Sequence, residues 1–402
     1  MQRRHWGIFI TIMIIASGPY LSPHFVQTVA RNAWPVIDAG GAAELGLAGP
    51  GLQVPGPGEA LERIRSNPGI RLLTSGEHAL DWVSRELAGT ATEKAVRLFK
   101  DKARFRRLLQ PLFPRLSFTE LSLDELPRHV PDAADYPFVA KPSVGFFSIG
   151  VHVVRSPADW QRAQSRISAE VASMKSIFPE HMLSQTHFLL EGYIEGSEYA
   201  VDAYYDADGQ PVVLNILEHR YAGSEDVSDR LYVSSKRIIE ALEPRATAFL
   251  SDINGLAGIR NFPLHAEFRC DCNGELVPIE VNPLRFGGWC TTGDFAHFAW
   301  GFNSYELYMN GAAPDWQKVF RGREQFEYGL VVLDNRTGIP SDKIGAFNYE
   351  ALLARFSNPL HLAKMDYASF PLFGFLFIAT ASAKKAEQDW ILGTDLSEFV
   401  TA

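Results

Sequence analysis

Two glutamates on either side of an Asn-Gly pair are the residues with the clearest chemical potential in this sequence. Glu267 and Glu280 flank Asn273-Gly274 in the segment 265–283. Asn-Gly between β-rich stretches is a strong hairpin signal, because both residues of a tight turn need positive φ. A two-residue turn would pair 272 with 275, 267 with 280 and 265 with 282. The two glutamates would then face each other with their Cβ atoms about 5 Å apart.

Facing carboxylates repel each other unless a shared proton or a cation neutralises them. Asn282 adds an amide oxygen on the same side of the ribbon, and an all-oxygen set suits Mg²⁺, with Mn²⁺ as an alternative. We therefore predict Glu267, Glu280 and Asn282 as metal ligands. An exposed acidic pair neutralised by Arg269, or a register slip that separates the acids, is the competing interpretation. The other side of the ribbon is expected to face the core through Ala266, Phe268, Cys270, Val277, Ile279 and Val281.

A lysine at the end of a short apolar strand is the second chemical feature. Lys141 follows the segment 137–140 and precedes a loop that contains Gly145, Ser148 and Gly150. Glycines let backbone N–H groups approach phosphate oxygens, and a lysine supplies a point charge. The spacing fits neither a Walker A motif nor a dinucleotide fingerprint. Phosphate binding and an ordinary hairpin loop are both open interpretations.

Acidic residues gather at a third position, where Glu191, Glu195 and Glu198 surround a connection between apolar stretches. An acid can accept the hydroxyls of a ribose, and an exposed backbone can contact an adenine edge. Solvated loop acids are the alternative. The stretch from Thr92 to Leu109 has helical spacing and seven cations, a pattern that is usually a solvated face.

The elements that position these residues indicate a mixed α/β chain. Strands at 8–15, 34–37 and 70–73, with a helix at 24–33, predict a small parallel sheet. Further on, we expect helices at 92–109, 156–176 and 231–256, a strand from 187 to 205, and a strand-and-helix extension after 326. The predicted domains are 1–92, 93–186, 187–320 and 321–402.

Composition limits the function classes. With 38 basic and 47 acidic residues, the net charge of -9 argues against nucleic-acid binding. Three cysteines, Cys270, Cys272 and Cys290, form no metal or disulfide pattern and are expected to be core thiols in a cytoplasmic protein. The apolar run 8–16 is too short to span a membrane. It resembles the start of a signal peptide, but a buried first strand is the preferred interpretation.

Taken in order, three motifs resemble the ATP-grasp superfamily, of the carboxylate–amine ligase type. They are Lys-Pro-x-x-Gly-x-x-Ser-x-Gly-Val from 141, Glu-x-x-Ile-x-Gly-x-Glu from 191, and an acid thirteen residues before Glu-x-Asn-Pro at 280. The resemblance covers roughly 94–311. It implies an α/β (α+β) ATP-grasp fold, preceded by a small α/β domain with a parallel sheet. ATP would be held between two α+β subdomains.

The resemblance also implies roles for individual residues. Lys102, with Lys100 as the rival, and Lys141 would contact the phosphates, and Ser148 and Gly150 would belong to a closing loop. The expected adenine and ribose contacts are Glu191, Gly192, Tyr193, Ile194 and Glu198. The expected metal ligands are again Glu267, Glu280 and Asn282.

Two positions depart from the family pattern. Many relatives carry an arginine where this chain has His265, and Arg285 stands one residue later than the arginine of Asn-Pro-Arg. Both are predicted as catalytic residues near the transferred phosphate, with packing as the alternative for His265. Candidates to line the substrate pocket are Arg220, Tyr221, Arg230, Arg269, Arg285 and Cys290.

The activity implied is ADP-forming ligation, in which ATP and Mg²⁺ activate a carboxylate as an acyl phosphate for attack by an amine. An amino acid or a small biosynthetic intermediate is the expected substrate. A small-molecule kinase, a noncatalytic nucleotide-binding module and a carrier-protein-coupled enzyme are the alternatives. The expected partners are small molecules, without nucleic acid or membrane, and a homodimer is left open.

Overall fold

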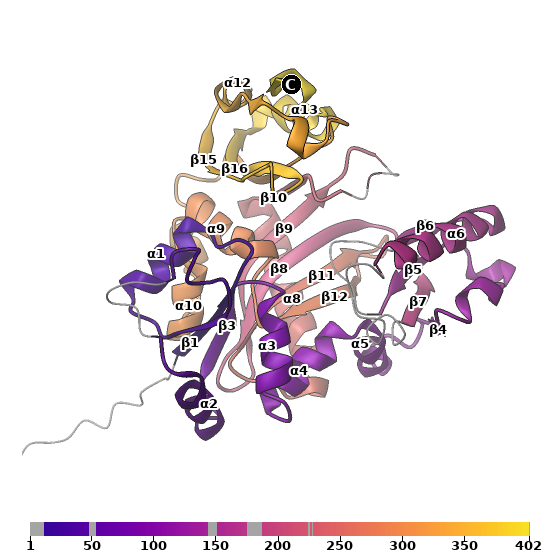
Figure 1. Cartoon of the computed structure of the whole chain (residues 1–402), viewed down its shortest axis with the longest axis horizontal. Helices are drawn as coiled ribbons and strands as arrows, with labels where there is room; N and C mark the ends of the chain where they lie inside the picture. Colours follow the sequence, from indigo (N-terminus) through magenta and orange to yellow (C-terminus); the bar gives the residue numbers. More distant parts are fainter. Residues whose placement is uncertain are drawn as a thin grey trace, which may run out of the picture.

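The computed structural model describes residues 12–47, 54–143, 151–174, 187–223, 226 and 228–401. Three main sheets organise this part of the chain (Figure 1). A small parallel sheet lies at the lower left, a long antiparallel sheet runs through the centre, and a four-stranded antiparallel sheet lies at the right. The C-terminal elements lie at the top of the central sheet. This arrangement is the mixed α/β organisation that the sequence predicts.

The N-terminal unit is built on a parallel sheet of order β2-β1-β3. Its elements are β1 (Ile12–Ser17), α1 (Pro23–Arg31), β2 (Val36–Gly40), α2 (Pro57–Ser66), β3 (Arg71–Thr74) and α3 (Ala79–Glu86). Along β1, Met13 and Ile15 pack into one apolar cluster, whereas Ile14 and Ala16 pack into another. A central parallel strand is buried on both faces, so a continuous apolar run forms it.

A break at Asp101 divides the predicted helix 92–109 into α4 (Ala91–Lys100) and α5 (Lys102–Leu109). The backbone of Asp101 is extended, with φ −90° and ψ 103°. Its carboxylate accepts a hydrogen bond of 3.1 Å from the backbone N–H of Arg104. An N-cap needs a non-helical backbone, so the prediction of one continuous helix was wrong.

The four-stranded sheet has the order β4-β7-β5-β6 with antiparallel pairing throughout. Its strands are β4 (Phe118–Ser122), β5 (Phe138–Pro142), β6 (His152–Val154) and β7 (His187–Gly192). Helix α6 (Pro157–Met174) covers one face, where Trp160 and Ile167 join Phe138 and Leu190 in an apolar cluster.

The central sheet has eight antiparallel strands in the order β12-β11-β8-β9-β10-β13-β16-β15. They are β8 (Ser197–Tyr205), β9 (Pro211–Arg220), β10 (Leu231–Ser234), β11 (Phe262–Cys270), β12 (Leu276–Pro283), β13 (Phe326–Asp334), β15 (Pro359–Lys364) and β16 (Leu372–Ala381). The last three belong to the C-terminal extension, which therefore continues this sheet. Strands β7 and β8 lie in different sheets, so the predicted strand 187–205 is interrupted at 193–196.

Strand β10 replaces the first turn of the helix predicted for 231–256. Val233 pairs with Glu218 of β9 and Gly329 of β13, which makes β10 an internal strand. Ser235 then caps α8 (Lys236–Ala257) by accepting the N–H of Ile238. The helical prediction was wrong for these four residues because packing in the sheet outweighs helix propensity.

The remaining elements are short. They are α9 (Thr291–Phe295), α10 (Ser304–Asn310), α11 (Trp316–Val319), α12 (Tyr349–Leu353), α13 (Ala386–Gly393), and a two-stranded ribbon of β14 (Ala346–Phe347) and β17 (Val400–Thr401). Short helical turns lie at 126–128, 133–135, 288–290, 296–300, 341–343, 382–384 and 397–399. Within the described ranges, no helix combines the length and apolar character needed to cross a bilayer.

Candidate functional site

The hairpin of β11 and β12 carries the predicted carboxylate pair. Glu267 lies directly opposite Glu280, and His265 lies opposite Asn282, which confirms the predicted register at these positions. Side chains alternate between the two faces of a strand, so all four lie on one side of the ribbon.

The turn itself is longer than predicted. Asp271 donates its N–H to the carbonyl of Glu275 at 2.9 Å, which leaves the three-residue loop 272–274. The Asp271 carboxylate accepts the N–H groups of Asn273 at 2.9 Å and Glu275 at 2.7 Å. Of the Asn-Gly pair, Gly274 alone has positive φ, at 80°. Because Cys272 lies in this loop, it is exposed, and the prediction of a core thiol was wrong there.

A β-bulge compensates for the longer turn. Phe268 pairs with Pro278 and not with Ile279, so Ile279 is the extra residue of β12. Between the turn and the bulge, the pairing of β11 with β12 is shifted by one residue from the predicted register. The bulge restores that register at Glu267 and Glu280. The shift also exchanges the two faces of β12 near the turn. Leu276 and Pro278 are buried there, whereas Val277 and Ile279, which were predicted to face the core, are half-buried.

The two carboxylates share a polar environment. The amide nitrogen of Asn282 donates to Oε1 of Glu267 and Oε1 of Glu280, each at 3.2 Å. Nζ of Lys102 lies 2.7 Å from Oε2 of Glu280. Burial and the adjacent Glu280 raise the pKa of Glu267 well above its usual value. Burial alone would do the same to Glu280, but Lys102 outweighs it and lowers that pKa well below its usual value. Of the two carboxylates, Glu267 is thus the one that more readily retains a proton.

This donor set fits a divalent ion that prefers oxygen ligands. Lys102 contacts Glu280, whereas burial and Glu280 disfavour the ionised form of Glu267, and a divalent cation would supply further positive charge between the two. Across the described residues, no group of three or more His, Cys, Asp or Glu side chains is arranged to hold a metal. A third protein oxygen would therefore come from Asn282.

Lys141 lies at the end of β5 and forms an ion pair with Glu191 of β7. Arg106 of α5 holds the same carboxylate, with Nε 2.7 Å from Oε2 and Nη2 3.2 Å from Oε1. The side chains of Arg106, Lys141 and Glu191 are 0%, 5% and 4% exposed. The structure thus directs the carboxylate of Glu191 into the interior toward Lys141.

Gly192 ends β7, and the connection 193–196 to β8 begins with Tyr193 and Ile194. The carbonyl of Ile194 accepts a hydrogen bond of 2.7 Å from Nη1 of Arg269, whose guanidinium also lies 5.0 Å from the centre of the Tyr193 ring. The same guanidinium binds Oε2 of Glu198 at 2.9 and 3.0 Å. Arg269 therefore fixes this connection to the start of strand β8.

An imidazole completes the surroundings of Glu198. Nδ1 of His219 lies 3.3 Å from Oε1 of Glu198, and the ring stacks on Tyr232 with centroids 4.3 Å apart. Tyr221 lies on the other side, with its centroid 4.1 Å from that of His219. Tyr221 and Arg269 are thus the two pocket candidates that lie next to the predicted ribose-binding acid.

Arg285 links the carboxylate pair to the N-terminal unit. Its Nη2 donates to Oδ1 of Asn282 at 2.9 Å, and its Nε donates to Oε2 of Glu77 at 3.1 Å. Glu77 follows β3 and also pairs with Lys100. Burial and the nearby cations Lys102 and Arg285 lower the pKa of Lys100 to about 7. Of the two rival lysines, Lys102 is the one that contacts the carboxylate pair.

His265 lies on the site face between two acids. Its Nδ1 is 2.7 Å from Oδ1 of Asp202, and its Nε2 is 3.6 Å from Oε1 of Glu267. The N–H of Gly287 also donates to Oδ1 of Asp202 at 3.2 Å. Asp202 therefore orients both the imidazole and the loop that follows Arg285.

Three other pocket candidates have partners away from the carboxylate pair. Arg220 pairs with Glu218 at 3.0 Å on the opposite face of the sheet, and Arg230 pairs with Asp334 at 2.6 Å. The buried thiol of Cys290 donates to a backbone carbonyl at 3.3 Å. The predicted loop residues Gly145, Ser148 and Gly150 lie outside the described residues.

Sequence reasoning missed Glu77, Arg106 and Asp202, although each carries a signal. Arg106 stands four residues after Lys102 on one helix, which places both on the same face. Asp202 stands four residues after Glu198 on one strand and shares its face. Glu77 follows the carboxyl end of a parallel strand, where such sheets present ligand-contacting residues.

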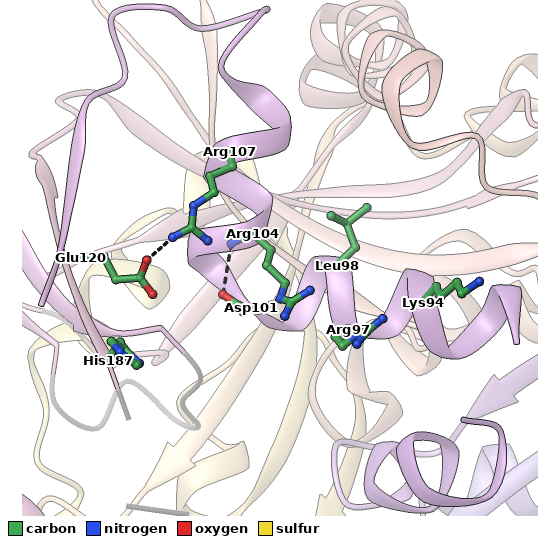
Figure 2. A pocket seen from close by; sticks show the side chains of 8 residues that line it. All are labelled: Lys94, Arg97, Leu98, Asp101, Arg104, Arg107, Glu120 and His187. Carbon is green, nitrogen blue, oxygen red and sulfur yellow. Dashed lines mark hydrogen bonds and ion pairs between the residues drawn. The ribbon is translucent and has the colours of Figure 1, made fainter. Parts of the chain in front are cut away.

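The outer side of α4 and α5 forms an open hollow of about 750 Å³ (Figure 2). It is lined by Lys94, Arg97, Leu98, Asp101, Arg104, Arg107, Glu120 and His187. Arg104 pairs with Asp101 at 2.9 Å, and Arg107 pairs with Glu120. The cations of this run therefore have two kinds of environment. Arg104 and Arg107 pair with acids at the surface, whereas Lys102 and Arg106 contact acids of the central and four-stranded sheets.

Comparison with known proteins agrees with this geometry. Residues 134–293 match the family model of the ATP-grasp domain. The match spans β5 to β12 and contains Lys141, the connection 193–196 and the carboxylate pair. The chain therefore contains an ATP-grasp domain. A search of the curated proteins finds no match.

Solved structures share the whole fold at low sequence identity. An L-amino acid ligase from Bacillus licheniformis has a TM-score of 0.66 and 16% identity, over 97% of this chain and 98% of that chain. An N5-carboxyaminoimidazole synthase from Aspergillus clavatus, in complex with ADP and 5-aminoimidazole ribonucleotide, has a TM-score of 0.65 and 14% identity, over 96% and 98%. A phosphoribosylglycinamide synthetase from Anaerococcus prevotii has a TM-score of 0.55 and 10% identity, over 97% and 98%.

Proposed function

We propose that this chain, with its ATP-grasp domain, is an ADP-forming ligase that activates a carboxylate as an acyl phosphate and joins it to an amine. One observation carries the proposal. The carboxylate pair with Asn282, the cations Lys102 and Arg285, and the edge of the N-terminal parallel sheet at Glu77 form one continuous network of contacts. A phosphate donor and an acceptor bound at that sheet edge would meet there.

ATP would bind between the two antiparallel sheets. The backbone of Tyr193 and Ile194 is proposed to contact the adenine, and Glu198 the ribose. Lys141 and Lys102 would contact the phosphates. Magnesium ions held by Glu267, Glu280 and Asn282 would offset the charge of the triphosphate when bound.

In the first step, an oxygen of the substrate carboxylate attacks the γ-phosphorus, and the bond from that phosphorus to the β-phosphate oxygen breaks, which releases ADP. Lys102 and Arg285 would lower the repulsion between the two anions. In the second step, the amine nitrogen attacks the acyl carbon, loses a proton and expels inorganic phosphate. His265, oriented by Asp202, would face the phosphate group on the site side of β11.

We propose an amino acid or a small peptide as the acid substrate; an L-amino acid is the substrate named for the Bacillus licheniformis ligase. The loop after Arg285 supplies an apolar wall. The ring of Trp289 lies 5.8 Å from that of Tyr20 and 5.7 Å from that of Phe370. Such a wall beside charged groups suits a substrate with an ionised end and an apolar side chain. The proposed compartment is the cytoplasm.

The test measures ADP and inorganic phosphate with Mg²⁺-ATP and a panel of amino acids, singly and in pairs. A ligase releases both products only when an acid and an amine are present, and mass spectrometry detects the condensed product. ADP release with one substrate, without inorganic phosphate, would indicate a kinase instead. Nucleotide binding without turnover on any substrate in the panel would argue against the ligase.

A further inference from the structure

Arg106 is a buried cation that contacts both sides of the candidate nucleotide site. Its Nε and Nη2 hold Glu191 in the four-stranded sheet, and Nη2 also donates to the carbonyl of Ile279 at 2.8 Å. Ile279 is the bulged residue of β12, next to Glu280. The side chain of Arg106 is fully buried, and its Nη1 has no hydrogen-bond partner among the residues that the structure describes.

The bulge explains why this contact exists. Because β12 is the edge strand of the central sheet, one row of its backbone groups has no strand partner. The extra residue leaves the ladder at Ile279, and its carbonyl accepts from Arg106. Arg106 therefore joins the strand of the metal candidates to the sheet of Lys141.

The cluster of Arg106, Lys141 and Glu191 carries a surplus positive charge. Burial alone would raise the pKa of Glu191, but Lys141 and Arg106 outweigh it and hold this pKa at about 2. Burial lowers the pKa of Lys141, and Glu191 opposes that effect. When Glu191 is ionised and Lys141 is protonated, two cations face one anion among side chains that are at most 5% exposed. An uncompensated buried charge is costly, so the cluster favours the arrival of an anion.

Phosphate binding to Lys141 would bring a second anion close to Glu191. If Lys141 were the sole partner of Glu191, the carboxylate would lose much of its compensation and would repel the phosphate. The two N–H groups of Arg106 keep a positive charge on the Glu191 carboxylate. The ammonium of Lys141 can therefore bind the phosphate. A planar guanidinium binds the carboxylate through two N–H groups while it also donates to a backbone carbonyl, a geometry that an ammonium does not reproduce.

We propose that Arg106 is a positioning residue for the nucleotide: it holds Glu191 as a fixed counter-charge, which leaves Lys141 for phosphate, and it ties β12 to the phosphate-binding sheet. This role rests on the proposed function, because it requires that the chain bind ATP. Arg106 lies outside the residues that match the family model.

The test compares Arg106→Met, Arg106→Lys and the control Arg107→Met by calorimetric titration with Mg²⁺-ADP and with a nonhydrolysable ATP analogue. Arg107 is the next residue on α5, but its side chain is 56% exposed and pairs with Glu120. We expect Arg106→Met to raise the nucleotide Kd at least about 10-fold. Arg106→Lys should give an intermediate Kd, and Arg107→Met should match the unsubstituted protein within about 2-fold.

A purely structural role predicts a different result. In that case Arg106→Met lowers the melting temperature but leaves the Kd of the folded protein unchanged, which would overturn the proposal. If Arg106→Met does not fold, Arg106→Lys decides, and a Kd equal to that of the unsubstituted protein would refute the role. An unsubstituted protein that binds no nucleotide would instead contradict the proposed function. If the unsubstituted protein and the Arg106→Met variant bind nucleotide with the same Kd, the proposed role of Arg106 is refuted and the proposed function is not.

Discussion

Replacing the buried Asp294 by asparagine is expected to remove a large, pH-dependent loss of stability. Asp294 lies in α9, directly after the loop that contains Trp289, and is 5% exposed. Its Oδ1 accepts a hydrogen bond of 2.9 Å from the hydroxyl of Tyr305. Burial raises the pKa of this carboxyl from 3.8 to about 7.

The sign follows from comparing the folded and unfolded chains. Below pH 3.8 the acid is protonated in both states. Between 3.8 and about 7 it ionises only in the unfolded chain, so the free energy of unfolding falls by about 1.4 kcal/mol per pH unit. Above pH 7 the loss is complete, at about 4 kcal/mol. The asparagine side chain does not titrate in this pH range, and its amide oxygen can still accept the hydrogen bond from Tyr305.

Urea denaturation of both proteins at several values between about pH 4 and pH 8 gives the difference in free energy of unfolding. This difference isolates Asp294, because the other groups titrate in both proteins. It should increase by about 4 kcal/mol in favour of Asp294→Asn from the acidic to the alkaline end. The exposed Asp252 of α8 is the matched control, and Asp252→Asn should change the free energy of unfolding by less than about 0.5 kcal/mol. A constant difference for Asp294→Asn would refute the reasoning.

Three further predictions concern the hairpin and its neighbour. Glu267→Gln should abolish ADP formation but leave the melting curve unchanged, since burial and Glu280 already disfavour a charged side chain at this position; retained turnover would remove it from the metal ligands. Gly196→Ala should lower the free energy of unfolding by about 3 kcal/mol or more in urea denaturation, because φ is +127° and a Cβ would lie 1.9 Å from the carbonyl oxygen of Cys270. An unchanged midpoint would contradict that geometry. Phe268→Ala, at a fully buried site behind Glu267, should cost about 3–5 kcal/mol in the same assay, and clearly more than Val277→Ala at a half-buried site.

Around the carboxylate pair, the local pattern of β11 and β12 was sufficient to predict which side chains share a face. Alternation along a strand is a short-range property, and it placed Glu267 and Glu280 opposite each other. The same pattern did not predict the loop length or the bulge. Both depend on where the Asp271 side chain binds and on how Ile279 meets Arg106, which lies far away in the sequence.

The predicted boundaries of helices and strands were wrong where a side-chain cap or a tertiary contact decided them. Asp101 could cap a new helix or continue the old one, and the cap formed because its carboxylate found the N–H of Arg104. The segment 231–234 has no strong helix-breaking residue, yet it is a strand because two neighbouring strands supply its hydrogen bonds. Propensity differences are small compared with such tertiary contacts.

The sequence by itself determined the fold class, the hairpin register at the carboxylate pair, and the position of Lys141 at a strand end. Only the tertiary structure decided which charges meet. Arg106 is 85 positions from Glu191, and Arg285 is 208 positions from Glu77. Ion pairs between distant elements leave no periodic trace in a sequence, because packing of the sheets and helices selects each partner. For that reason the surplus charge around Lys141 becomes visible only when the elements are assembled.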